Sequence, residues 1–324
     1  MKNCMRLGAA ALRLAFTFSL LSFDARASAA APPWEGEAFS AKPAALLAAV
    51  KGHESKEEWE ADILLSDSRY TLEADGRWTE RHHRIYVVLD AAEIDAWAVF
   101  EHPWSPWFQK RPEMRARVIS PAGREFQLDP QTISEESIGR SSDVLFDDDR
   151  MLRAPLPGVE VGALVETEVV VRDERPMFVG GSVRRLGLYE DHYRLARISV
   201  DAAEAAGLRW LARKLPATPP SESAEKGRKR LRFEYRDLEG TTSYVDGLPS
   251  SEAWYPYLAL SSGKSWSEVA KSYADVVDRT LAGAEVSRAV ATATRGASAQ
   301  TEVVDRLLAY LQKEIRYTGV EFGD

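Results

Sequence analysis

Beyond residue 4 this chain has no cysteine. Cys4 is the only one among 324 residues, and it precedes the apolar run near the N-terminus, whereas a lipid-modified cysteine would follow that run. Cys4 lies in a segment that we expect to be cleaved off as a signal peptide. The mature chain would then have no thiol and no disulfide, so its stability must come from packing alone. A cysteine nucleophile and a thiolate metal site are excluded as well.

Asparagine is also scarce, and positive charges are fewer than negative ones. Asn3 is the only asparagine, so no acceptor site for N-glycosylation follows it. Lysine and arginine number 42 against 50 aspartates and glutamates, which gives a formal net charge of −8. An acidic chain lacks the electrostatic footprint of a nucleic-acid-binding protein, and we expect no nucleic-acid partner.

The first 29 residues have the pattern of a secretory signal peptide. Lys2 and Arg6 give a positive start, Leu14 to Phe23 is an apolar run too short to span a bilayer, and small-x-small cleavage patterns lie between residues 25 and 29. An uncleaved anchor helix is the alternative. Because no second apolar stretch of membrane length follows, we expect an exported protein, periplasmic or secreted, with no membrane span after cleavage. Cleavage removes a net charge of +3 and leaves −11.

Three regions follow the signal peptide. Residues 30–56 predict a proline-rich linker and a short helix over Lys42 to Val50. Residues 57–258 show many short strand patterns separated by glycine and proline turns, which is typical of an antiparallel β-sandwich. Helical periodicity dominates residues 259–324. We therefore expect a mainly β fold with an α+β tail.

Turn residues and periodicity locate the main features of the sandwich. Asp75-Gly76 and Pro121-Ala122-Gly123 each predict a hairpin, since these residues tolerate the backbone angles of tight turns. Gly162 to Arg172 is the clearest strand. Three further predictions concern less regular segments: a strand over Ala96 to Glu101, a surface loop over Pro216 to Gly227, and a crossover out of the sandwich over Asp246 to Lys264.

Two helices are predicted after the sandwich. The first begins with a capping box, Ser265 and Glu268, and has an apolar face. That face comprises Trp266, Val269, Ala270, Tyr273, Val276, Val277 and Leu281. The second lies in Thr301 to Asp324 and runs into a strand, Ile315 to Phe322. No closing element follows, so we expect the sequence to be the front part of a larger exported protein.

In this order the features resemble the exported bacterial transglutaminase-like proteins, whose first domain is a β-rich module of unknown function. The resemblance runs from about Trp59 to the end. It rests on the two hairpins, Leu156-Pro157-Gly158 leading to Gly162, Pro176, the Trp266 helix, and the terminal segment Ile315 to Gly323. It implies that residues 259–324 are the first part of a transglutaminase-like domain.

The resemblance also implies which catalytic groups to look for. The family's nucleophile lies in a Gly-Asp-Cys segment, with histidine and aspartate further on. Gly323-Asp324 directly follows the predicted strand and has no cysteine after it, so none of these positions is present. We assign no catalytic residue, no cofactor and no metal, and we expect a chain that is not an enzyme as it stands.

The most distinctive local run is His102 to Phe108. Its prolines hold the backbone extended and could present Trp104, Trp107 and Phe108 as a stacking platform for a peptide or a cell-wall glycan. The alternative is that the rings pack over an end of the sandwich or against the following domain. In that case Trp97, Trp254, Tyr255 and Tyr257 could join the same interface.

Other motifs give weaker indications. His82 and His83 are adjacent in a strand, so they point to opposite faces and cannot share a metal ion. Neither His53 nor His192 has a partner at ligand spacing. The remaining motifs are an acidic stretch without the pattern of a calcium loop (Asp143, Asp147, Asp148, Asp149), an incomplete phosphate loop (Gly263-Lys264-Ser265), and an incomplete nucleophile elbow (Gly180 to Arg184).

Our leading hypothesis is a non-catalytic exported module that binds, positions or scaffolds a catalytic domain. One alternative is a fragment of a Cys-His-Asp peptidase or acyl transferase that acts on peptides. The other is a self-sufficient β-sandwich that binds a glycan or peptide at the Trp104–Trp107 region. The sequence does not specify the oligomeric state.

Overall fold

The computed structural model describes residues 31–51, 56, 59–138, 148–190, 192–239, 247, 253–263, 265–282 and 286–314. Contacts divide the chain into Met1–Ala31 and Pro32–Asp324, and every element below belongs to the second unit. Several predictions concern residues outside this description: the signal peptide, His53, Asp143, Asp147, Lys264 and the strand Ile315 to Phe322.

The described residues contain fourteen strands and eight helical segments. The strands are β1 (Ala61–Leu72), β2 (Trp78–Val88), β3 (Val99–Trp104), β4 (Gln109–Ile119), β5 (Glu125–Gln127), β6 (Ser134–Ser137), β7 (Arg150–Pro155), β8 (Leu164–Asp173), β9 (Val183–Gly187), β10 (His192–Ala203), β11 (Arg209–Arg213), β12 (Ser221–Glu225), β13 (Arg228–Glu239) and β14 (Tyr257–Ser261). The helical segments are η1 (Pro33–Glu35), α1 (Pro43–Val50), α2 (Ile94–Trp97), η2 (Pro130–Thr132), η3 (Glu204–Ala206), α3 (Trp266–Ala282), α4 (Val286–Ala293) and α5 (Gln300–Glu314).

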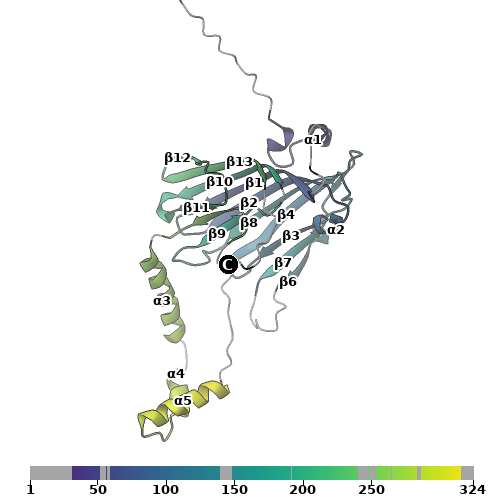
Figure 1. Ribbon diagram of the computed structural model, residues 1–324. Coiled ribbons are helices and arrows are strands. Elements are labelled where there is room, and N and C mark those ends of the chain that lie inside the picture. Colours follow the sequence, from purple (N-terminus) through teal and green to yellow (C-terminus); the bar gives the residue numbers. More distant parts are fainter. Residues whose placement is uncertain are drawn as a thin grey trace, which may run out of the picture. The chain divides into compact units, whose positions relative to one another are not determined.

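The strands form three sheets (Figure 1). The large sheet has eight strands in the order β12-β13-β10-β1-β2-β8-β4-β5, and the two small sheets are β11-β14-β9 and β3-β7-β6. One continuous core joins side chains of all three, among them Trp78 and Phe233 from the large sheet, Leu152 from β7 and Leu258 from β14. The small sheets therefore cover one face of the large sheet. A mainly β fold followed by helices is confirmed.

Both hairpins predicted from their turns are present. β1 pairs with β2 in antiparallel register around Gly76, which has φ 90°. β4 pairs with β5 around Gly123, which has φ 83°. A positive φ is strained for any residue with a side chain, which is why glycine at these turns is informative. The short helix expected over Lys42 to Val50 is α1.

The prediction that the strands are all antiparallel is wrong for the large sheet, because β1 and β10 run parallel. β1 has β2 on one side through the first hairpin, and β10 takes the other side after a long stretch of chain. Hydrophobic alternation shows which residues face the core, but it is the same for parallel and antiparallel neighbours. The sequence pattern therefore had no means of showing this pairing.

Three segment predictions are corrected. Ala96 to Glu101 is the end of α2 followed by β3, and not one strand. The expected loop Pro216 to Gly227 contains β12, whose side chains are all exposed, so it has no apolar alternation to reveal it. The expected crossover contains β14, the middle strand of the β11-β14-β9 sheet.

The opposite face of the large sheet carries buried charge. Glu166 on β8 accepts hydrogen bonds from the Arg117 guanidinium (2.8 Å) and from the Phe39 backbone N–H (2.6 Å), and its other partner is His83 (2.8 Å). Burial opposes ionisation, but these donors and the Arg117 charge keep the pKa of Glu166 below its ordinary value. Glu166 thus ties the N-terminal segment, which contributes Phe39, to the sheet.

We expect Glu166→Gln to lower the free energy of unfolding by about 3 kcal/mol or more, because it leaves the buried Arg117 guanidinium without its main carboxylate partner. Urea denaturation of both proteins at pH 7 measures the difference. The matched control is Glu113→Gln, which removes an exposed ion pair to Arg172 (2.6 Å) and should cost less than about 0.5 kcal/mol. Equal effects of the two substitutions would show that the buried cluster has no special role.

Candidate binding groove

A groove lies between α3 and the segment Glu174 to Ser182, which joins β8 to β9. Its volume is about 920 Å³. The lining is mostly apolar and aromatic, which is typical of ligand and peptide sites. The residues that line it are Trp107, Arg175, Met177, Phe178, Gly181, Ser182, Val183, Trp266, Val269, Ala270, Tyr273, Val276 and Arg279.

The sheet side of the groove is fixed to the core through Ser182. The Trp78 indole Nε1–H donates to Ser182 Oγ at 2.8 Å, and the Ser182 backbone N–H donates to Ser262 Oγ at 3.0 Å. Trp78 is only 1% exposed. A buried indole N–H without a hydrogen-bond partner would destabilise the fold. The bond to Ser182 gives the Trp78 indole N–H that partner.

Two glycines allow the close approach on which the groove depends. A Cβ on Gly181 would lie 2.4 Å from the Ser262 carbonyl oxygen, and Gly181 also has φ 128°. A Cβ on Gly180 would lie 3.0 Å from the Val269 Cα of α3. Side chains at these positions would push β14 and α3 away from the segment. The Gly180-Gly181 pair, an incomplete nucleophile elbow in the sequence, therefore serves packing.

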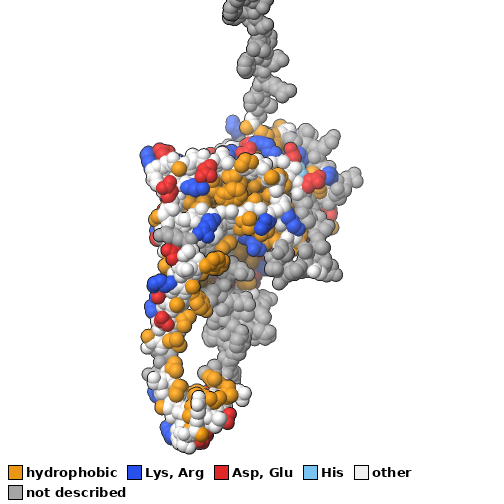
Figure 2. Space-filling view, turned by 60° about the vertical axis from the view of Figure 1, so that its left-hand side comes forward, with side chains coloured by type: hydrophobic (Ala, Val, Ile, Leu, Met, Phe, Trp, Pro, Cys, Tyr) orange, Lys and Arg blue, Asp and Glu red, His pale blue; other side chains and the backbone are white. Residues whose placement is uncertain are grey.

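The helix side of the groove presents the apolar face predicted from the sequence. Ser265 caps the helix, since its Oγ accepts a hydrogen bond from the Glu268 N–H at 3.2 Å. No residue of α3 is buried, and Trp266 and Tyr273 are 86% and 59% exposed. Figure 2 shows hydrophobic side chains exposed along this helix. Such a face is incompletely covered by the residues that the structure describes.

The three candidate platform residues have different surroundings. Trp107 lines the groove, with the Arg175 guanidinium 5.4 Å from its ring centroid. Trp104 packs against the sandwich core, and Phe108 is buried. The structure therefore separates the expected platform into one groove residue and two packing residues. Ligand binding at Trp107 stays a prediction.

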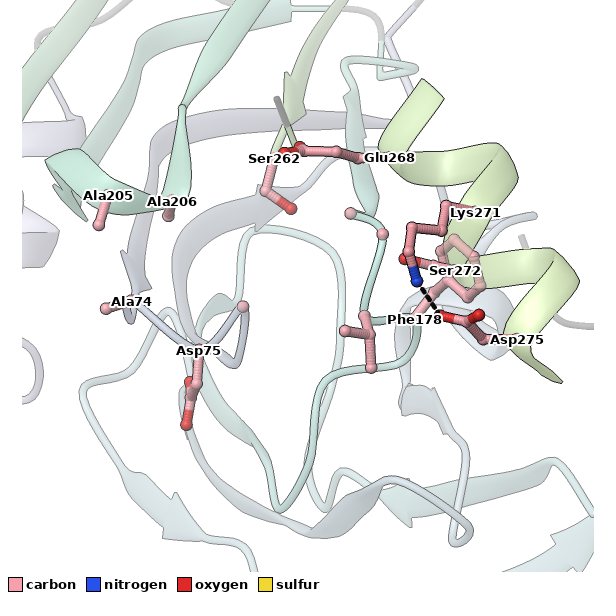
Figure 3. Close-up of a pocket in the computed structure, with 15 residues that line it drawn as sticks. Ala74, Asp75, Phe178, Ala205, Ala206, Ser262, Glu268, Lys271, Ser272 and Asp275 are labelled. Atoms are coloured by element: carbon pink, nitrogen blue, oxygen red, sulfur yellow. Dashed lines mark hydrogen bonds and ion pairs between the residues drawn. The ribbon is translucent and has the colours of Figure 1, made fainter. Parts of the chain in front are cut away.

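A second, more polar pocket lies beside the N-terminal half of α3 (Figure 3). Its volume is about 330 Å³, and the Asp75-Gly76 turn, Gly181, Gly263 and α3 contribute to its walls. Lys271 is paired with Asp275 at 2.8 Å, and Asp75 with Arg77 at 2.7 Å. Lys271, the only cation in this lining, is therefore already compensated.

One partly buried cluster has the composition of a catalytic triad. Ser68 Oγ lies 3.0 Å from His82 Nδ1, and His82 Nε2 lies 3.3 Å from a Glu80 carboxylate oxygen. Ser68 is only 2% exposed, and none of the three residues lines either pocket described above. A nucleophile must reach its substrate, so this arrangement does not form an active site.

Burial and charge shift the pKa values around that cluster. Burial, followed by the charge of His82, lowers the pKa of His102 to about 4. Burial alone would raise the pKa of Glu80, but His82 and Arg184 lower it to about 2. The folded protein therefore holds His102 neutral and Glu80 ionised over most of the acidic range.

The other histidines that the structure describes have structural partners. His82 and His83 do lie on opposite faces, as predicted, with Glu80 and Glu166 as their respective carboxylates. His192 contacts Asp62 at 3.1 Å and stacks on Trp59 with ring centroids 4.4 Å apart. In the described part of the chain no cluster of three or more acidic, histidine or cysteine residues could hold a metal ion. Nor does that part include a helix long and apolar enough to span a membrane.

Comparison with known proteins places this fold. The model of a family described as a domain of unknown function with a solved structure, DUF3857, matches residues 74–242. The chain belongs to this family. A search of the curated proteins found no match.

Among solved structures, a protein from Parabacteroides distasonis described as a "putative protease" is similar to this DUF3857 protein, with 15% identity and a TM-score of 0.61. The match covers 78% of this chain and 50% of that one, so this chain spans about half the length of that protein. At this identity the likeness shows the fold alone.

Two further solved structures match less well. A "putative nutrient binding protein" from Legionella pneumophila has 10% identity and a TM-score of 0.32, with 78% and 81% of the two chains covered. An M1 zinc metallopeptidase from Deinococcus radiodurans has 12% identity and a TM-score of 0.32, with 62% and 42% covered.

Sequence reasoning found the helix side of the groove and Trp107, but it missed Arg175, Met177 and Phe178. No single one of these residues indicates a binding site, but the short pattern to which they belong does carry information. Three apolar residues, Met177 to Val179, followed by Gly180-Gly181 indicate a segment that approaches another backbone closely. Which backbone it approaches depends on β14, which the sequence did not reveal.

The pKa of His102 predicts acid sensitivity. The unfolded chain protonates His102 near its ordinary value of 6.5, whereas the folded protein resists protonation down to about 4. The free energy of unfolding should therefore fall by up to about 3 kcal/mol as the pH drops through this window. Urea denaturation at pH 7.0 and 4.5 measures the loss, and His102→Gln should remove much of it.

Glu80 provides the control for that experiment. Its pKa is lowered from 4.5 to about 2, so its stabilisation is present above pH 4.5 and lost only below that value. Glu80→Gln should therefore change the acid dependence mainly below pH 4.5. If His102→Gln leaves the difference between pH 7.0 and 4.5 as large as in the unmodified protein, His102 is not its cause.

Proposed function

We propose that this DUF3857 protein is a non-catalytic exported module that binds and positions a transglutaminase-like catalytic domain of the same polypeptide. The observation that carries the proposal is the apolar face of α3, which stays exposed beside a groove of about 920 Å³. An amphipathic helix is stable when its apolar stripe is covered, and a large exposed apolar patch marks an interaction site.

Two further points support this occupant. The order of sequence features resembles the transglutaminase-like proteins, in which the β-rich domain precedes the catalytic one. The similar Parabacteroides protein, described as a "putative protease", is about twice as long as the part of it that this chain matches. A folded domain supplies the extended apolar surface that a groove lined by Trp107, Trp266 and Tyr273 requires.

The residues available support the non-catalytic part of the proposal. The sequence has no cysteine beyond Cys4, and the Ser68–His82–Glu80 cluster is closed to substrate. Two residues with a hydroxyl group line the groove, Ser182 and Tyr273. Ser182 Oγ already accepts a hydrogen bond from the Trp78 indole N–H. A serine engaged in this way, with no histidine in the lining, is not an activated nucleophile.

We expect the purified chain to show no turnover with fluorescent casein, or in the transfer of a fluorescent amine to casein glutamines. His82→Ala is the matched variant, because it breaks the only triad-like cluster recognised among the described residues. Turnover by the unmodified chain that His82→Ala abolishes would overturn the non-catalytic assignment.

The binding half of the proposal is tested by hydrogen exchange. Amides of α3 should exchange at least tenfold faster than those of β1 and β10 in this chain, because no residue of α3 is buried. Joining the gene's downstream coding sequence after Asp324 should slow exchange in α3 by about tenfold or more, while β1 stays unchanged.

The control for this experiment is Tyr273→Asp, which places a charge on the apolar face and should prevent the slowing. Two outcomes contradict the proposal. One is unchanged exchange of α3 in the longer protein. The other is a downstream sequence that encodes no transglutaminase-like domain, since the proposed occupant would then not exist.

A further inference from the structure

Four aromatic side chains form a cluster at one end of the β11-β14-β9 sheet, away from the groove residues. This aromatic cluster consists of Tyr189, Trp254, Tyr255 and Tyr257. The rings of Tyr189 and Tyr255 lie 4.2 Å apart between centroids, Trp254 and Tyr255 5.5 Å, and Tyr255 and Tyr257 6.1 Å. Tyr189 is 47% exposed and the other three are partly buried, so solvent reaches the cluster mainly at Tyr189.

Backbone contacts hold the cluster in place. The Leu188 N–H donates to the Pro256 carbonyl at 2.9 Å, which joins the chain before Tyr189 to the chain after Tyr255. Lys214 Nζ donates to the Trp254 carbonyl at 3.0 Å. The Tyr189 ring lies over Gly187, where a Cβ would meet it at 2.3 Å. The rings are therefore positioned before any ligand arrives, which limits the entropy lost on binding.

Cations flank the aromatic cluster. Arg185 on β9 lies 4.8 Å from the Tyr257 ring centroid, and Arg213 on β11 is the register partner of Tyr257. Lys214 follows directly. Among the described residues no carboxylate pairs with Arg185 or Arg213 by an ion pair, which is unusual in a chain of net charge −8.

Within the described strands of the small sheet, strand register places no acid beside these cations. Alternate residues of the small sheet face the core, and the others face outward. The outward set comprises Val183, Arg185, Gly187, Arg209, Leu211, Arg213, Tyr257, Ala259 and Ser261. It contains arginines but no aspartate or glutamate. The nearby Glu190 is compensated by Arg84 at 2.8 Å.

We propose that the aromatic cluster with Arg185, Arg213 and Lys214 is a binding site for an acidic glycan, one whose sugars carry carboxylates. A pyranose ring presents a face of C–H groups that stacks on tyrosine and tryptophan, and its hydroxyls bond to the phenols. The guanidinium of arginine matches a carboxylate with two parallel hydrogen bonds. The site is independent of the groove and of its proposed occupant.

The charge distribution favours this ligand over two others. Nucleic acid carries a phosphate at every nucleotide and needs many cations in a row, whereas this surface has a few beside one aromatic cluster in an acidic protein. An acidic peptide could pair with the arginines, but it would leave the ring faces without flat partners. A carboxylated sugar uses both parts of the surface at once.

The test is a fluorescence titration of the purified chain with tetragalacturonic acid, a uronic-acid tetramer, and with its neutral counterpart galactotetraose. Trp254 in the cluster reports binding. The dissociation constant of the acidic tetramer should be at least tenfold lower than that of the neutral one. This ratio should shrink as the salt concentration is raised from 50 to 500 mM, because salt screens the charges. Tetraglutamate and a thymidine tetranucleotide complete the set.

Variants separate the two parts of the site. Arg185→Gln combined with Arg213→Gln should weaken the acidic tetramer at least tenfold and leave the neutral one unchanged. Gly187→Ala should displace the Tyr189 ring and weaken both sugars. Arg111→Gln removes an exposed arginine on β4 and should change neither. Far-ultraviolet circular dichroism checks that each variant is folded.

Several results would overturn the inference. They are no binding of the acidic tetramer, equal binding of both sugars, or tighter binding of tetraglutamate or the tetranucleotide. The same holds if the double arginine variant binds the acidic tetramer as well as the unmodified chain does. None of these results bears on hydrogen exchange in α3, so failure here is distinguishable from failure of the proposed function.

Discussion

The hydrogen bonds around Trp78 are the constraint on which both candidate surfaces depend. Its backbone N–H donates to Asp173 at the end of β8 (2.9 Å), and its indole N–H donates to Ser182 just before β9. Ser182 in turn donates from its backbone to Ser262, directly after β14. One buried side chain thus fixes the sheet side of the groove and the start of the sheet that carries the aromatic cluster.

The two surfaces differ in how much order they have before binding. The aromatic cluster stands on a paired sheet and has backbone contacts on both sides, so a ligand there orders little of the protein. The apolar face of α3 has no buried residue, and covering it would also order the helix. The groove therefore suits a large partner that contributes much apolar area, whereas the aromatic cluster suits a small or linear ligand.

Sequence patterns predicted the parts of the fold that depend on neighbouring residues. The hairpins at Gly76 and Gly123, the strand β8 and the apolar face of α3 follow from turn chemistry and periodicity. The parallel pairing of β1 with β10 and the exposed strand β12 do not, because neither changes the local pattern. For the same reason Trp107 could be nominated from its motif, but its partner segment could not.

The acid dependence of binding should follow from the fold and not from the groove. The lining of the groove contains Arg175, Arg279 and Tyr273 but no histidine and no carboxylate. His102, by contrast, is held neutral in the folded protein with a pKa of about 4. A partner lost between pH 6.5 and 4 would therefore be lost because the sandwich is destabilised, and the pH dependence of binding would track the pH dependence of unfolding.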